Sequence, residues 1–209
     1  MNKKISALLL AGAMMLSLAA CGAKEETPAP APSTPAPEAS APAGEVAGLT
    51  APIAEAPALV TSGGQSADYQ MIATVMGKVG MDYTVANLCT SADLGNAKTL
   101  IVVVGGSSKG LGAAGIDADG ELARLTELLD GAKSAGLTVI AMHTGGEARR
   151  GELSDKFITP IFEKADYAIV VTSGDEDGLM SGICASKGIP MDGIKSISEV
   201  ATVLPAAFK

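Results

Sequence analysis

Residues 99–104 read TLIVVV, a run in which only the first residue is polar. Side chains of a β-strand point alternately to its two faces, so a strand without polar alternation is apolar on both faces. Strands of this kind lie at the centre of a parallel sheet that helices cover on both sides. The run therefore predicts an α/β fold with residues 99–104 as a central strand.

Stretches typical of strands and helices alternate on both sides of this run. Four more strands are predicted, at residues 58–62, 83–88, 137–142 and 167–172. Apolar residues three and four positions apart predict helices at 68–79, 121–135, 152–164, 178–186 and 198–208. The helix at 152–164 is expected to break at Thr159-Pro160.

Regular alternation of strands and helices predicts one α/β domain, a three-layer α/β/α sandwich of the Rossmann-like or flavodoxin-like kind. The sheet should contain about five mostly parallel strands. Two strand orders, 2-1-3-4-5 and 3-2-1-4-5, stay open.

The N-terminal part of the chain has the composition of an export signal. Residues 1–20 begin with two lysines and continue as an apolar run, which is typical of a secretory signal peptide. The run of about 16 residues is shorter than the roughly 20 needed to span a bilayer, which disfavours a transmembrane helix. Residues 18–21, LAAC, resemble the lipobox of bacterial lipoproteins. The resemblance implies lipidation of Cys21, removal of residues 1–20 and anchoring at the extracytoplasmic face of a bacterial membrane.

Residues 21–57 comprise Cys21 and a segment rich in Pro and Ala, which holds 8 of the 11 prolines. Such a segment has little apolar surface to bury, so we expect a disordered tether, with the globular domain at 58–209. The domain carries 12 basic and 18 acidic residues. Without a basic cluster it is not expected to bind nucleic acid.

Ligands of open parallel sheets bind beside the carboxyl ends of the strands, so candidate site residues are those that follow each strand. After the first strand come Gly63, Gly64 and Ser66. The glycines would let a ligand approach the backbone. The alternative is a plain tight turn, with Ser66 or Asp68 capping the next helix.

The central strand is followed by residues 105–117, GGSSKGLGAAGID, which we interpret as a long Gly-rich binding loop. Its candidate ligand-binding residues are Gly105, Gly106, Ser107, Ser108, Lys109 and Gly110. Residues 110–115 match G-x-G-x-x-G, but five residues separate this match from the strand, so the pattern does not predict a dinucleotide site. No Gly-Lys-Ser/Thr occurs either, and no cofactor is expected.

The fourth strand is followed by residues 143–151, HTGGEARRG. His143 is the only histidine of the chain. The forked guanidinium group of an arginine can bind a carboxylate or phosphate through two hydrogen bonds. Candidate ligand-binding residues here are His143, Gly145, Gly146, Arg149 and Arg150. The alternative is that both arginines pair with local acids such as Glu147, Glu152 or Asp155.

Two further features are interpreted structurally. The acidic stretch 172–178 is expected to cap a helix rather than bind a cation. With one histidine and no clustered cysteines, no metal site is predicted. Cys89 and Cys184 are predicted to be unpaired, because either strand order places them toward opposite edges of the sheet. Their Cα atoms should then be farther apart than the roughly 7 Å that a disulfide allows.

The segments GGSSKGLGAAGID and HTGGEARRG resemble those of a family of secreted or lipid-anchored bacterial α/β domains that is classified as a domain of unknown function. The resemblance spans residues 58–208. It implies the fold and no activity, so it assigns no catalytic residue.

Three kinds of function follow as hypotheses. The first is a membrane-tethered module that binds a small anionic ligand at the carboxyl edge of the sheet. The second is a cell-surface hydrolase using Ser66, Ser107 or Ser108 with His143 and Asp175. The third is a protein-docking domain.

Overall fold

The computed structural model describes residues 46–209. The signal peptide, the lipidation site Cys21 and the tether up to residue 45 lie outside the described residues. Within residues 46–209 no helix is both long and apolar enough to cross a membrane.

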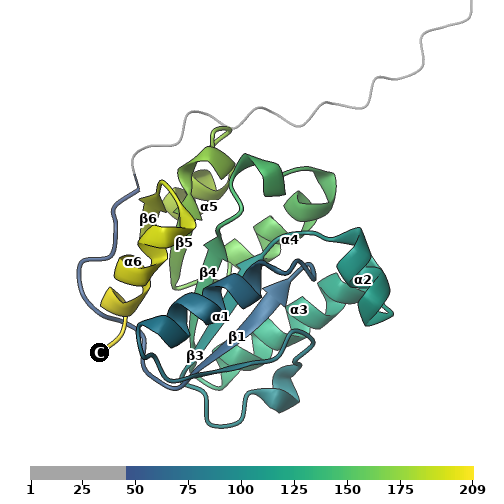
Figure 1. Ribbon diagram of the computed structural model, residues 1–209, viewed down its shortest axis with the longest axis horizontal. Coiled ribbons are helices and arrows are strands. Elements are labelled where there is room, and N and C mark those ends of the chain that lie inside the picture. The colour runs from purple at the N-terminus through teal and green to yellow at the C-terminus, as the bar shows by residue number, and fades with distance from the viewer. Residues whose placement is uncertain (1–45) are drawn as a thin grey trace, which may run out of the picture. The chain divides into compact units, whose positions relative to one another are not determined.

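The described chain forms one sheet of six parallel strands in the order β2-β1-β3-β4-β5-β6 (Figure 1). The strands are β1 (Ala58–Gly63), β2 (Tyr83–Val85), β3 (Thr99–Val104), β4 (Thr138–His143), β5 (Tyr167–Val171) and β6 (Met191–Ile194). The helices are α1 (Asp68–Lys78), α2 (Ser108–Ala114), α3 (Ala118–Ser134), α4 (Glu152–Phe162), α5 (Leu179–Lys187) and α6 (Val200–Ala206).

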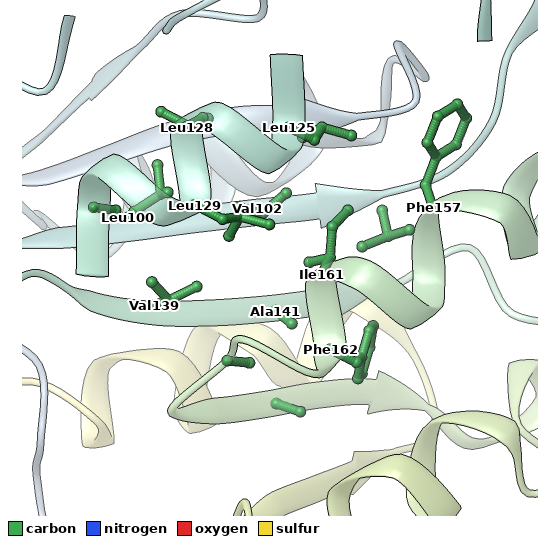
Figure 2. Close-up of a cluster of buried hydrophobic side chains, with 14 of the residues drawn as sticks. Leu100, Val102, Leu125, Leu128, Leu129, Val139, Ala141, Phe157, Ile161 and Phe162 are labelled. Carbon is green, nitrogen blue, oxygen red and sulfur yellow. The ribbon is translucent and has the colours of Figure 1, made fainter. Parts of the chain in front are cut away.

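Strand β3 is central and fully buried, as its sequence predicts. Leu100 and Val102 point to one face, where α3, α4 and α5 pack, and Ile101 points to the other, where α1 and α6 pack. Figure 2 shows the first of these interfaces, with side chains of α3 and α4 lying on β3 and β4. The three-layer α/β sandwich is therefore confirmed, and of the two strand orders left open the structure has the one in which β1 separates β2 from β3.

Four details of the sequence prediction are wrong. Strand β6 was missed because it has only four residues and contains Gly193. Strand β2 ends at Val85 rather than at residue 88. The segment 105–117 is not one long loop, because residues 108–114 form helix α2. Finally, α4 continues through Pro160. The hydrogen bond that proline cannot make would go to the carbonyl of Lys156, an exposed residue where water can replace it.

The described chain also includes residues that precede β1. Residues 46–54, here called the strap, run along the amino ends of the strands and pack on the outer part of the sheet. The backbone N–H groups of Ile53 and Ala54 donate to the carbonyl of Ala207, and Met191 N–H donates to the carbonyl of Ala47. Ala54 is fully buried, and Leu49 and Ile53 pack against the core, so the strap is part of the domain.

Cys89 and Cys184 are both free and buried, which confirms that they do not form a disulfide. Cys89 follows edge strand β2, and Cys184 lies in α5, on the other side of β1, β3 and β4. Burial raises the pKa of both thiols, that of Cys184 to about 12. Both cysteines therefore pack as small apolar side chains.

The strap predicts a measurable contribution to stability. A chain that begins at residue 55 loses the three hydrogen bonds of the strap named above and the buried side chain of Ala54. At about 1 kcal/mol net per hydrogen bond, the thermal midpoint should fall by about 6–12 °C relative to a chain that begins at residue 46. Equal midpoints for the two chains, measured by circular dichroism, would show that the strap adds nothing to the fold.

Candidate functional site

The segments that follow β1, β3 and β4 meet at the carboxyl edge of the sheet. The chain winds from β1 to β2 on one side and then returns past β1 to β3, so the switch in strand order lies between β1 and β3. Open α/β sheets bind ligands beside such a switch. The structure places all the candidate ligand-binding residues at this edge, in the segments 63–68, 105–110 and 143–150.

The glycines after β1 and β3 are packed against protein rather than open to a ligand. A Cβ on Gly106 would lie 2.8 Å from the backbone of Leu153, and one on Gly110 would lie 1.9 Å from the carbonyl oxygen of Gln65. A Cβ on Gly63 would lie 2.6 Å from the side chain of Ile161, and one on Gly105 would lie 2.7 Å from the side chain of Ser66. Glycine is required here so that the segments can touch.

The backbone N–H groups of these glycines are also in use. Gly64 N–H donates to Glu121, Gly105 N–H to the carbonyl of Gly63, and Gly106 N–H to Ser154 Oγ. The N–H of Ser107 donates to the carbonyl of Gly64. The expected cradle of N–H groups around a ligand is therefore replaced by hydrogen bonds that join the segments after β1 and β3 to each other and to α3 and α4.

The polar residues between these glycines have different surroundings. Ser107 Oγ caps α2 by accepting from the N–H of Gly110 at 3.0 Å, whereas Ser108 and Lys109 are exposed on that helix. Lys109 forms no ion pair within residues 46–209. Ser66 is buried, and its Oγ lies 3.4 Å from the N–H of Asp68.

A buried ion pair that the sequence analysis did not identify holds this edge together. Glu121 of α3 is fully buried, and its carboxylate accepts from Gly64 N–H and from the Arg124 guanidinium. Arg124 also donates to the carbonyls of Ser62 and Cys89, at 2.7 and 2.8 Å. The sequence contains one signal for this pair: position 121 falls on the helical face of the buried leucines.

Arg150 is held entirely by protein groups. Its guanidinium donates to the carboxylates of Asp155 and Asp177 and, at 2.6 Å, to the carbonyl of Gly174. These contacts join the segment after β4 to the segment after β5. Of the two alternatives for Arg150, pairing with local acids is the one that the structure shows.

Arg149 lies differently from its neighbour. Its side chain is 43% exposed, and its Nε lies 3.2 Å from Oδ2 of Asp68, a carboxylate of α1 that is only 7% exposed. The stem of Arg149 lies on Gly145, where a Cβ would come within 1.9 Å of it. Gly146, with φ of +59°, faces Ser173 of the next segment. Gly145 thus leaves room for Arg149 to cover Asp68.

Three buried polar atoms lack a hydrogen-bond partner within the described chain. They are Asp68 Oδ2, His143 Nδ1 and Thr144 Oγ1, and all three follow β1 or β4 at this edge. The Asp68 atom has Arg149 nearby, but not in hydrogen-bond geometry. Buried polar groups are normally satisfied, so the concentration of these atoms makes this edge a candidate polar site.

His143 is fully buried at the end of β4. Its Nε2 lies 3.4 Å from the carbonyl oxygen of Arg149, and its ring packs against Gly174. Burial is the largest cause that lowers the pKa of His143 below its ordinary value. The ring is therefore neutral at pH 7, with Nε2 placed to donate and Nδ1 left as an unpaired acceptor.

A hollow of about 250 Å³ opens at the start of α4. Its lining combines Arg149 with the first turn of the helix, residues 151–154, in which no side chain caps the helix. The N–H groups of a first helical turn have no partner within the helix and attract anions. Cationic and N–H donors thus meet in one small hollow.

The groups that a Ser/His hydrolase requires have other partners or none. Ser107 caps α2, and the carboxylate of Asp175 caps α5. Neither ring nitrogen of His143 contacts a serine hydroxyl. Ser66 and Ser108 are likewise not hydrogen-bonded to it. Among residues 46–209 the geometry shows no nucleophile paired with a base. No group of three potential metal ligands occurs in the same residues.

The fold and this edge define a class: single-domain parallel α/β proteins with a polar site beside the switch in strand order. The chain belongs to the family described as "Domain of unknown function (DUF6305)", whose model matches residues 55–208. No curated protein matches the sequence.

Solved structures with some likeness include two further proteins. One is the psychrotrophic esterase EstA from Pseudoalteromonas sp., at 12% identity and a TM-score of 0.30, covering 66% of this chain and 76% of that one. The other is TesA, at 13% identity and a TM-score of 0.30, covering 65% and 77%. Neither likeness bears on what this chain does.

The packing of the glycines can be tested within a single helix. Gly110→Ala places a methyl group against the backbone of Gln65 and should destabilise the fold by about 1–3 kcal/mol. Gly112→Ala, two residues further along α2, meets nothing within 4 Å and should stabilise the helix by about 0.5–1 kcal/mol. Urea unfolding of both variants measures the difference. If the two substitutions have the same effect, Gly110 is not required for close contact.

The buried histidine predicts a pH dependence of stability. Because burial lowers the pKa of His143, the unfolded chain binds a proton more readily than the folded one, so the free energy of unfolding should fall as pH falls below about 6.5. His143→Gln keeps a polar amide and removes the titration. Urea unfolding at several pH values should give a flatter curve for the variant. Parallel curves would show that His143 does not titrate differently in the two states.

Proposed function

We propose that this protein is a lipid-anchored, extracytoplasmic module that binds a small anion in the hollow at the start of α4. The observation that carries the proposal is that the half-exposed guanidinium of Arg149 and the uncapped first turn of α4 line the same hollow. The anchor and the location rest on Cys21 and the export signal, as argued from the sequence.

The size and charge of the hollow restrict the ligand. A volume of about 250 Å³ suits a group such as phosphate, sulfate or a small carboxylate. Glu152 also lines the hollow, so a ligand that extends beyond its anionic group should present a hydrogen-bond donor there. Lys109, exposed at the same edge, is available to a larger ligand. The domain as a whole is acidic, so attraction is confined to short range.

The ligand contacts differ from those expected from sequence. Arg149 supplies the charge, and α4 supplies the N–H donors. The N–H groups of the Gly-rich segments are already used in hydrogen bonds within the protein. An arginine hydrogen bond to an anion is charge-assisted and can be bidentate. A neutral ligand would gain little from either group.

The test is a calorimetric titration of residues 46–209 with inorganic phosphate, sulfate and acetate. Loss of one charge-assisted contact costs about 1.5–3 kcal/mol, so Arg149→Ala should weaken binding by about 10-fold to 150-fold. The matched control is Lys133→Ala, which removes one positive charge from a surface ion pair with Asp166, at the other end of α3. Failure of all three anions to bind, or equal binding by Arg149→Ala, would refute the proposal.

A further inference from the structure

A second hollow, of about 360 Å³, opens near the amino ends of β5 and β6, at the edge of the sheet opposite to Arg149. It lies between the strap and α6, which run side by side in Figure 1. Most of its wall is apolar and comes from Leu49 and Pro52 of the strap and from Val203 and Ala206 of α6. The hollow therefore offers a surface on which a short hydrocarbon chain can lie.

The carboxylate of Asp192 in β6 also lines this hollow, and the protein holds it in place. Its Oδ2 accepts from the hydroxyl of Tyr167 and, at 3.3 Å, from the backbone N–H of Leu49. Burial raises the pKa of the Tyr167 hydroxyl, which therefore stays protonated and keeps donating. Its Oδ1 lies beside Gly48, where a Cβ would not fit. The side chain is thus fixed at the boundary between the strap and the sheet.

The charge and the hydrogen-bonding capacity of Asp192 are only partly used. Within residues 46–209 it forms no ion pair, whereas Asp166, directly before β5, pairs with Lys133. An ionised carboxylate has about four acceptor positions, and Asp192 receives two hydrogen bonds from the described residues. The half-buried carboxylate can therefore accept from a cation in the hollow.

The surroundings of Asp192 select the kind of cation. A hard metal ion such as Ca²⁺ needs about six to eight oxygen ligands, and the hollow offers a single carboxylate. An ammonium group has three N–H donors and no acceptor, which suits one carboxylate together with the hydroxyl of Thr202, the other polar side chain that α6 places in the wall. The apolar wall favours an ammonium group that carries a hydrocarbon chain.

We propose that the hollow between the strap and α6 binds a small aliphatic primary amine as its ammonium ion, with the ammonium group on Asp192 and the alkyl chain on the apolar wall. Such amines, like the side chain of lysine, are charged at pH 7. The site is separate from the anion hollow at the start of α4, and neither proposal depends on the other.

The test is an NMR titration of isotope-labelled protein with butylammonium chloride. The amide signals of Leu49 and Thr202 should shift, and those of Gly151 and Glu152, in the anion hollow, should stay in place. A ligand this small should bind in roughly the millimolar range. The neutral analogue 1-butanol has the same chain without the charge, so it should bind at least about tenfold more weakly.

Two variants test the contacts within the hollow. Asp192→Asn keeps an oxygen for Tyr167 and Leu49 and removes the charge, so butylammonium should bind about 10-fold to 150-fold more weakly. Ala206→Phe places a bulky side chain at an exposed position of the wall and should also weaken binding. The control is Glu55→Gln, which removes one negative charge at the same edge, from a surface ion pair with Lys209, and should keep the parent's Kd.

Each possible outcome decides the proposal. Absence of shifts at Leu49 and Thr202 up to about 0.1 M butylammonium overturns it, as does equal binding of 1-butanol. An unchanged Kd in Asp192→Asn, or an equal loss of binding in Glu55→Gln, also overturns it, and Asp192 then serves only to hold the strap. Circular dichroism shows whether each variant is folded, and if Asp192→Asn is not, an unchanged Kd in Ala206→Phe overturns the proposal in its place.

Discussion

The arrangement of the carboxyl edge depends on the buried ion pair between Glu121 and Arg124. Arg124 donates to the carbonyls of Ser62, near the end of β1, and of Cys89, beyond β2, and Glu121 accepts from the N–H of Gly64. Burying two charges is costly and is offset only when hydrogen bonds satisfy both groups, as they do here. The pair therefore fixes where the segments after β1 and β2 leave the sheet, and with them the position of Asp68.

Close backbone contact is the second constraint on this edge. Because the segments after β1 and β3 touch through glycine, backbone N–H and carbonyl groups of these glycines bond within the protein and are not free to bind a ligand. A Gly-rich sequence beside a parallel sheet can thus serve cohesion as well as recognition. What remains available to solvent is a small set of side chains, which includes the charged groups of Lys109 and Arg149.

The sequence predicts the layers of this fold well because uninterrupted apolar runs such as residues 99–104 directly indicate which strands are buried. Residues 191–194 carry no such run, since edge strand β6 has two half-buried residues and an exposed glycine before its one buried residue, Ile194. Helix α2 is not evident from the sequence because two of its residues, Gly110 and Gly112, are poor helix formers by propensity. Its existence depends on the Ser107 cap and on packing of Leu111, which only the tertiary structure shows.

The candidate site could be located from sequence but not resolved into roles. Topology alone brings the ends of β1, β3 and β4 together, so the relevant segments were identifiable. Arg149 and Arg150 are adjacent, and sequence cannot say which of them meets Asp155 and which meets Asp68. Glu121 was overlooked because its neighbours Leu122 and Leu125 describe a stripe that an acid does not ordinarily join.

The strap has a mechanical consequence. It meets the domain at the amino ends of the strands, where Ala54 lies beside Phe208 and the carbonyl of Ile53 accepts from Thr138 Oγ1. A strand of six residues is about 20 Å long, so a pull on the chain from its N-terminal side acts on the end of the sheet that is farthest from Arg149. The load is borne first by the bonds to Ala207 and Met191. A pulling force on the N-terminal side of the domain can therefore detach the strap while the carboxyl edge of the sheet keeps its structure.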